Sequence, residues 1–379
     1  MRKSFRISAR SLLLSLLVLV LLIMAVFSVQ IMKIFKTPTD PIAYGDFPAL
    51  PVWVFSANDE IISTPGVFDH TIFVQTNNFL YSIDISKQII NWKVAAVNNQ
   101  ELVVPPLVAN PLVIVAENGS SLSSYSIENG ELVWKTQNIE IANNVTASIE
   151  AMTFNKRFLY VARFDWGLTA YNRETGELVW EHSIPGRAYP YIVANEETII
   201  LAVKNSISVL DAITGAILWE VDIKGYAGPI LLSENKLFVT DEKNITITAI
   251  DLSTHQIDWV ADYSSIIGSF DFSCLIEDGQ NLVIASSKLV TVSKNNGKMI
   301  WKSEDMGTLE CPIILKNNVY VRNTGNDLYS IDTKSGNVKG TLSVGEDTFL
   351  SHAHFRGPVA LMDWLIVPIG DNRVSIYQP

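Results

Sequence analysis

The sequence has few of the residue patterns on which common catalytic sites depend. Only two of its 379 residues are cysteines, and Cys274 and Cys311 are 311 − 274 = 37 residues apart, so no Cys-Cys pair is present. No phosphate-binding glycine loop and no Ser-His-Asp or Cys-His arrangement stands out. We therefore expect no catalytic residues, no cofactor and no metal.

Basic residues are scarce beyond the N-terminus. The first 37 residues hold six of the 28 Lys and Arg residues and none of the 39 Asp and Glu residues. The remainder therefore carries 22 basic and 39 acidic residues, a net charge of 22 − 39 = −17. An acidic surface repels phosphate backbones, which excludes nucleic acid as a partner.

The N-terminal segment has the pattern of a membrane anchor. Residues 1–10 contain four Lys or Arg residues and no acid, and residues 11–35 are mostly apolar. About 20 apolar residues suffice to cross a bilayer as a helix, and the basic flank stays in the cytoplasm. We predict a cytoplasmic stub (1–10), a single-pass transmembrane signal anchor (11–35) in the cell membrane, a stiff proline-bearing linker (36–49) and an extracytoplasmic domain (50–379).

A cleaved signal peptide is the alternative, with a cleavage site near Val26-Phe27-Ser28. The apolar run is longer than the usual signal core of ~7–15 residues, and Lys33 and Lys36 suit an interface, so we favour the anchor.

A hairpin pattern recurs through the rest of the chain. In Leu168–Trp180, apolar residues alternate on either side of a turn that Asn172 opens and Gly176 closes. The turn openers are Asp84, Ser126, Asn172, Asp211, Asp251, Ser293 and Asp332. Eight residues after the first six openers stand Trp92, Trp134, Trp180, Trp219, Trp259 and Trp301, and after the seventh stands Gly340.

Successive openers are 39 to 46 residues apart by subtraction, with room for four short strands each. This period predicts an all-β propeller of four-stranded blades. The C-terminal Val374–Gln378 matches a third strand, and Leu50–Phe55 carries Trp53 92 − 53 = 39 residues before Trp92. We therefore predict an eight-bladed ring whose last blade joins both chain ends and hides their open edges.

The repeat identifies a type of propeller. The pattern Leu-x-Ala-x-Asp-x-x-Thr-Gly-x-x-x-Trp is almost whole at Leu168–Trp180 and Ile207–Trp219, and no Trp-Asp or Gly-Gly pair occurs. It resembles the repeat of pyrroloquinoline quinone (PQQ)-like propellers. The resemblance implies that Trp53 and the six repeat tryptophans pack against neighbouring blades. The turn openers are expected to cap turns rather than bind metal, because one carboxylate per blade does not converge on a single point. Gly340 leaves blade seven without this aromatic wedge, so blade seven is expected to be the softest.

PQQ-like propellers include dehydrogenases and a non-catalytic scaffold of outer-membrane assembly. The resemblance implies that a PQQ enzyme holds its cofactor with a vicinal disulfide and calcium ligands on long insertions, which this sequence lacks. We therefore expect a protein-binding scaffold of unknown partner. A PQQ-dependent dehydrogenase and a carbohydrate- or ligand-sensing ectodomain remain the alternatives.

Two long loops, 136–150 and 344–357, are the predicted places for partner contact, because loops on rigid scaffolds concentrate function. His352 and His354 would share a strand face, but no third metal ligand is identifiable beside them. The candidate contact residues are His352, His354, Arg356, Arg163, Asp165 and Trp166.

Cys274 and Cys311 align with equivalent inner-strand positions of neighbouring blades. A disulfide needs Cα atoms within about 7 Å, and inner strands of adjacent blades usually lie farther apart. We predict two buried thiols, with an extracytoplasmic disulfide as the alternative.

Overall fold

The computed structural model describes residues 42–48, 50–97, 104–117, 121–136, 140–141, 145–146, 149–163, 167–183, 191–267, 274–343, 357–370 and 372–379. The chain divides into Met1–Asp40 and Pro41–Pro379, and the described residues all belong to the second unit. The predicted stub and anchor, 1–35, and the first part of the linker lie outside them. Within the described ranges, no helix is long and apolar enough to cross a membrane.

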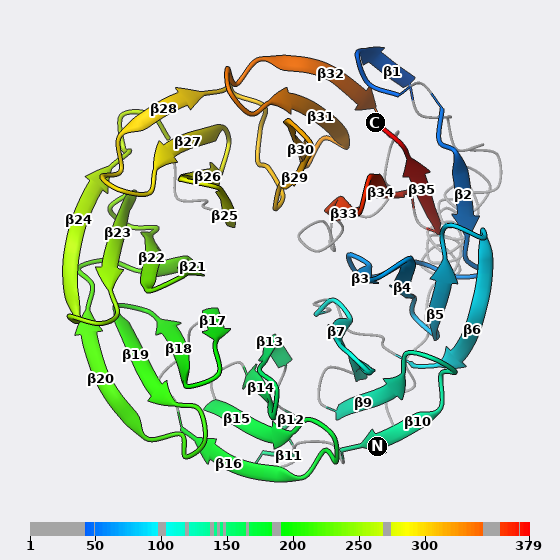
Figure 1. Ribbon diagram of the computed structural model, residues 1–379, viewed down its shortest axis with the longest axis horizontal. Coiled ribbons are helices and arrows are strands. Elements are labelled where there is room, and N and C mark those ends of the chain that lie inside the picture. The colour runs from blue at the N-terminus through cyan, green and yellow to red at the C-terminus, as the bar shows by residue number, and fades with distance from the viewer. Residues whose placement is uncertain are drawn as a thin grey trace, which may run out of the picture. The chain divides into compact units, whose positions relative to one another are not determined.

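Eight sheets follow one another around a ring (Figure 1). Blade one is β3 (Gly66–Phe68), β4 (Thr71–Gln75), β5 (Phe79–Asp84) and β6 (Ile89–Ala95). Blade two is β7 (Leu107–Ala109), β8 (Leu112–Glu117), β9 (Ser121–Ser126) and β10 (Leu132–Lys135). Blade three is β13 (Ile149–Phe154), β14 (Phe158–Arg163), β15 (Gly167–Asn172) and β16 (Leu178–His182). Blade four is β17 (Tyr191–Ala194), β18 (Thr198–Val203), β19 (Ser206–Asp211) and β20 (Ile217–Asp222).

The second half of the ring repeats this order. Blade five is β21 (Ala227–Ser233), β22 (Lys236–Asp241), β23 (Thr246–Asp251) and β24 (Gln256–Asp262). Blade six is β25 (Cys274–Asp278), β26 (Asn281–Ala285), β27 (Leu289–Ser293) and β28 (Met299–Lys302). Blade seven contains β29 (Ile313–Leu315), β30 (Asn318–Arg322), β31 (Asp327–Asp332) and β32 (Val338–Ser343). A hairpin of β11 (Glu140–Ile141) and β12 (Val145–Thr146) stands outside the blades.

The burial of each strand follows from its position in the blade. The second strands lie between two neighbouring blades, and every residue of β8 and β14 is buried. Such strands are apolar without alternation because both of their faces pack. The fourth strands form the outer wall, where β16 and β20 alternate between exposed and half-buried residues beyond their first position.

Blade eight confirms the predicted closure by both chain ends. It consists of β33 (Val359–Leu361), β34 (Trp364–Ile369), β35 (Arg373–Tyr377) and, from the N-terminal side, β2 (Trp53–Ser56). Trp53 pairs with Ile376 and Phe55 with Val374 in an antiparallel register. Inner strand β33 contacts both β29 and β3, so the eight blades form a closed ring.

An additional strand corrects the predicted boundary of the linker. Residues 42–45, assigned to the linker 36–49, form β1 (Ile42–Gly45), which pairs antiparallel with β32 as a fifth strand of blade seven. Phe47, two residues after β1, is buried against Tyr320 and Tyr377. Blade seven therefore has an aromatic wedge despite Gly340, contrary to the expectation that it lacks one.

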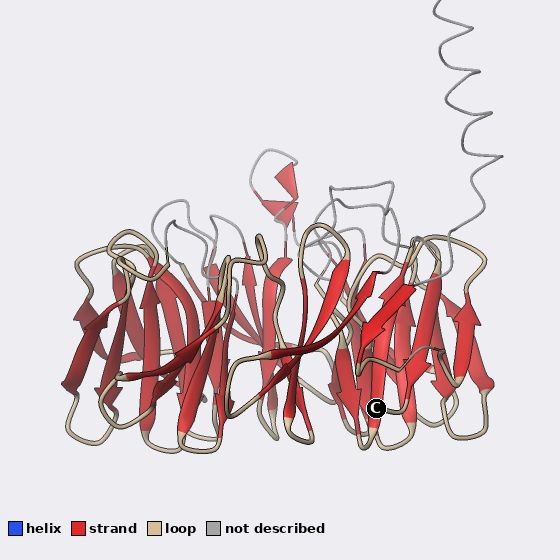
Figure 2. Cartoon of the chain, turned by 90° about the horizontal axis from the view of Figure 1, so that it is seen from above, coloured by secondary structure: helices blue, strands red, loops and turns tan. Residues whose placement is uncertain are grey.

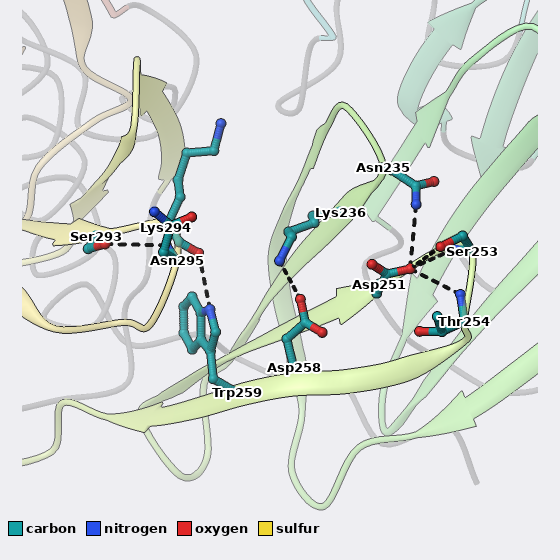
Figure 3. A network of polar contacts seen from close by, with 10 residues as sticks. All are labelled: Asn235, Lys236, Asp251, Ser253, Thr254, Asp258, Trp259, Ser293, Lys294 and Asn295. Atoms are coloured by element: carbon teal, nitrogen blue, oxygen red, sulfur yellow. Dashed lines mark hydrogen bonds and ion pairs between the residues drawn. The ribbon is translucent and has the colours of Figure 1, made fainter.

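Repeat tryptophans join one blade to the next, as the resemblance implies. The indole nitrogens of Trp92, Trp134, Trp180, Trp259 and Trp301 donate to the carbonyl oxygens of Ile127, Arg173, Ala212, Lys294 and Thr333, at 2.9, 2.9, 3.4, 3.0 and 2.7 Å. Each acceptor follows the turn opener of the next blade, and Figure 3 shows the bond from Trp259. These indoles also cover the turn glycines Gly130, Gly176, Gly215, Gly297 and Gly336, where a Cβ atom would lie 2.4–2.7 Å from the nearest atom.

The turn openers act as caps. The Asp251 carboxylate accepts hydrogen bonds from the backbone N–H groups of Ser253 and Thr254, at 2.8 and 3.0 Å (Figure 3). Asn172, Asp211 and Asp332 accept the same pair of backbone bonds in their own turns. Such side-chain bonds replace the partners that the turn backbone loses.

Cys274 and Cys311 form a disulfide with a Cα–Cα distance of 4.9 Å, so the prediction of two buried thiols is wrong. Cys274 begins β25, and Cys311 stands just before β29 with an exposed side chain. The prediction assumed the spacing of two inner strands, whereas Cys311 lies in the segment before β29, which comes close to the first residue of β25. The bridge joins these two blades beside the central channel.

Candidate protein-binding face

The strands run between two faces of the ring, which differ in their connections (Figure 2). We call loop face the side on which second strands turn into third strands and outer strands lead to the next blade. We call turn face the opposite side, which carries the repeat turns and the short turns between first and second strands. Both predicted long loops join strand ends on the loop face, since β10 leads to β13 and β32 leads to β33.

Arg163 lies at the loop-face end of β14 with only 4% of its side chain exposed. Its Nη2 group forms an ion pair with Glu181 of β16, whose side chain is 49% exposed. Within the described part of the chain, its Nε has no hydrogen-bond partner. Arg163 thus holds Glu181 at the surface, and whether it contacts a partner stays a prediction.

Blade two carries the reversed pair at the matching positions. Glu117 ends β8 as Arg163 ends β14, and Lys135 follows Trp134 as Glu181 follows Trp180. The buried Glu117 carboxylate pairs with Lys135 and accepts a hydrogen bond of 2.9 Å from the Tyr125 hydroxyl. Burial and the Glu117 charge raise the pKa of Tyr125, so this phenol stays a neutral donor. Neighbouring blades thus present a cation and an anion at equivalent surface positions.

Blade five presents an aromatic side chain on this face. Tyr226, before β21, is 56% exposed, and its backbone N–H donates to the Asp241 carboxylate at 3.0 Å. Asp241 also accepts bonds from the backbone of Lys243 and Asn244. The Lys243 amine lies 5.9 Å from the centre of the Tyr226 ring. A fixed aromatic ring beside a cation suits a protein contact.

The other predicted contact residues lie outside the described residues, namely Asp165, Trp166, His352, His354 and Arg356. The described strands that flank them, β14 and β15 on one side and β32 and β33 on the other, end or begin on the loop face. Within the described ranges, no group of three or more His, Cys, Asp or Glu residues has the arrangement of a metal site.

Sequence reasoning missed Glu117, Lys135, Tyr226 and Asp241. The repeat alignment contained a signal for the first two, because they share positions with Arg163 and Glu181. Tyr226 and Asp241 are 15 residues apart, and this spacing gave no indication that they are in contact.

The fold, the tryptophans that join neighbouring blades and the turn caps together define a PQQ-like eight-bladed propeller. The family described as outer membrane protein assembly factor BamB matches residues 51–261 and, in an overlapping match, 185–305. These matches span more than half of the chain, which therefore belongs to this family.

A curated relative, the outer membrane protein assembly factor BamB of Shewanella oneidensis, is 24% identical over 293 residues. The match covers 75% of this chain, and the chain spans 62% of the length of that relative.

Two solved structures share the fold at low identity. BamB from Moraxella catarrhalis superposes with a TM-score of 0.66 at 13% identity, covering 87% of this chain and 99% of that chain. A europium-containing methanol dehydrogenase superposes with a TM-score of 0.64 at 11% identity, covering 85% of each chain. At such identities the likeness concerns the fold alone.

Proposed function

We propose that the chain is a protein-binding scaffold without catalytic activity, held on the extracytoplasmic side of a membrane by its N-terminal segment. The observation that carries the proposal is membership of a family described as an outer membrane protein assembly factor. The partner is a protein of membrane assembly that contacts the loop face.

Three features of the loop face support this role. The exposed Tyr226 ring, the Glu181 carboxylate held by Arg163 and the Lys135 amine held by Glu117 stand on three blades. The Glu181 and Lys135 side chains are held by ion pairs and the backbone of Tyr226 by Asp241, which limits the freedom lost when a partner binds. Aromatic side chains and fixed charges on a rigid surface favour recognition of a folded protein.

The residues do not fit the cofactor that the repeat is named for. A vicinal disulfide is absent from the sequence, and both cysteines are used in the bridge between β25 and the segment before β29. This mismatch supports the scaffold over the dehydrogenase.

Site-specific photocrosslinking in the native envelope tests the scaffold proposal. A photoreactive phenylalanine analogue would replace Tyr226 on the loop face or Ile213 on the turn face, which are 56% and 52% exposed. We expect one discrete protein adduct from position 226 and none from position 213. Adducts from position 213 alone would contradict the loop face as the contact surface, and no adduct from either would contradict the scaffold.

Anchoring has its own test. Intact-mass measurement of the membrane-extracted chain should show residues 1–35 retained, and carbonate washing should leave it in the membrane. Loss of the first 26 to 28 residues would instead establish the cleaved signal peptide near Val26-Phe27-Ser28.

A further inference from the structure

The seam between blades seven and eight is filled by a segment that precedes the repeats. We call residues Ile42–Phe47 the strap. A Cβ atom added to Gly340 would lie 2.5 Å from the Phe47 nitrogen, 2.8 Å from the Tyr44 oxygen and 3.0 Å from the Phe47 Cβ atom. Gly340 holds the repeat position that is tryptophan in the six preceding copies. The strap therefore occupies the space that the missing side chain would need.

At this seam Phe47 takes the packing position that a repeat tryptophan has between other blades. Its side chain is 5% exposed. Its ring meets Tyr320 of blade seven at 6.0 Å and Tyr377 of blade eight at 5.8 Å, both edge to face. Edge-to-face pairs of this kind add stabilisation beyond the burial of their surface. One phenylalanine thus bridges the two blades.

The backbone of the strap is fixed by the outer edge of β32. Four residue pairs, from Ile42–Ser343 to Gly45–Gly340, align the strands, and the Asp46 N–H donates to the Lys339 oxygen at 3.0 Å. Gly45 has a φ of +66°, and a Cβ atom there would lie 2.3 Å from the Lys339 oxygen. Glycine is therefore required on both sides of this contact.

Among the described strands, β32 is the only hydrogen-bonded neighbour of β1, and Tyr44 is 60% exposed. The strap can leave without breaking the ladder of β29 to β32. It has the arrangement of a peptide added to a sheet edge with one side chain in a pocket.

We propose that the outer edge of β32 and the space over Gly340 form a binding site for an extended peptide carrying a glycine and, two residues later, an aromatic residue. The strap is the ligand of this site within the same chain. It replaces the tryptophan that the seventh repeat lacks and makes the last seam depend on a removable segment. This site is separate from the loop-face contact under Proposed function.

Suppression between two substitutions in the full chain tests the replacement. Phe47→Ala and Gly340→Trp should each lower the melting temperature by several degrees, the first by emptying the seam and the second by displacing the strap. In the double variant Phe47→Ala/Gly340→Trp, the Phe47→Ala change should cost no stability beyond that lost in Gly340→Trp, because the strap that carries Phe47 is already displaced and the indole occupies the seam as in other blades. Gly325→Ala in the same blade is the control, since its added Cβ meets no atom closer than 3.3 Å. A double variant in which Phe47→Ala lowers the melting temperature by as much as it does in the parent chain would overturn the replacement.

A free peptide tests the binding site. In a full-length variant with residues 42–47 changed to a Gly-Ser sequence of equal length, the synthetic peptide of residues 41–48 should bind and raise the melting temperature. The Phe47→Ala peptide should bind at least tenfold more weakly, and Gly340→Ala in the ring should abolish binding. If the Gly-Ser variant does not fold, the Gly-Ser/Gly340→Trp variant should restore folding without the strap, and failure of both would overturn the proposal. A folded Gly-Ser variant that leaves the peptide free would also refute the site.

Discussion

The seam between blades two and three and the seam between blades seven and eight solve one packing problem in different ways. At the first, Trp134 of blade two covers Gly176 of blade three and donates to the Arg173 oxygen. At the second, Phe47 arrives from outside the repeats and lies between Tyr320 and Tyr377. The glycine stands on the receiving blade in one case and, as Gly340, on the preceding blade in the other. The glycine admits the Trp134 ring at the first seam and the backbone of Tyr44 and Phe47 at the second.

The seam between blades four and five adds a third arrangement. His255 stands where five of the other six repeat turns have glycine, and it keeps a positive φ of 56°. Its ring stacks on Trp219 with centroids 4.6 Å apart. At this seam a stacked imidazole therefore takes the place beside the indole that turn glycines occupy at other seams.

The largest effect is expected from breaking the seam that contains both chain ends. Deleting residues 373–379 removes β35, which lies between β2 and β34, and opens two sheet edges. The remaining chain should lose its cooperative melting transition and aggregate on size-exclusion chromatography. Deleting residues 378–379 alone is the control, because β35 ends at Tyr377. A deletion variant that melts like the parent would show that the ring closes without β35.

Next in size is removal of an indole from a regular seam. Trp134 is 7% exposed and donates to Arg173, so Trp134→Ala should lower the free energy of unfolding by about 3–5 kcal/mol. Leu132→Ala on the same strand, where the side chain is 54% exposed, should change it by less than about 0.5 kcal/mol. Urea denaturation of the two variants measures the difference, and equal losses would contradict the wedge role.

A smaller loss of stability is expected from replacing a turn glycine, which can be needed for its positive φ, for close packing, or for both. Gly176→Ala faces both a φ of +72° and a contact of 2.6 Å with the Trp134 ring, whereas Gly279→Ala faces only a φ of +59° with open space. We expect a loss of about 1 kcal/mol for Gly279→Ala from backbone strain, and about 1–3 kcal/mol more for Gly176→Ala from overpacking. Equal values would mean that the ring of Trp134 moves aside freely.

The smallest effect concerns the turn caps at acid pH. Hydrogen bonds from Ser253 and Thr254 lower the pKa of Asp251 to about 2 from the ordinary value of 3.8. Because this pKa is lower in the folded state, the cap stabilises above about pH 4, and the contribution is lost as the pH falls towards 2. Asp251→Ala should lower the melting temperature at neutral pH and flatten its acid dependence. An unchanged slope between the two pH values would contradict the cap.

Regular features of the ring could be predicted because they repeat. The register of the tryptophans predicted four-stranded blades in an eight-bladed ring, and the described sheets have this arrangement. The closure was predictable because Val374–Gln378 and Trp53 complete one repeat between them. The role of the turn openers was also predictable, because each cap bonds to the backbone two and three residues further along the chain.

Features that depend on a single long-range contact could not be predicted. The four residues of β1 sit in a proline-bearing segment, and their partner Gly340 is about 300 residues away. The disulfide could not be predicted because it depends on a Cα–Cα distance, 4.9 Å, that the sequence pattern does not determine. At the candidate face, the residue type of Arg163 was visible, but its burial and its pairing with Glu181 come from the strand register.

The pairing of β2 with β35 also dictates an order of events during synthesis. Trp53 and Ile376 are 376 − 53 = 323 residues apart, so β2, which is among the first strands to leave the ribosome, waits for β35. Each intermediate blade can form from neighbouring residues, whereas β2 has no sheet until β35 has been synthesised. Long-range strand pairing is slow, and waiting edges are prone to aggregation. This protein should therefore need a chaperone for its N-terminal strand during biogenesis more than for any other part of the ring.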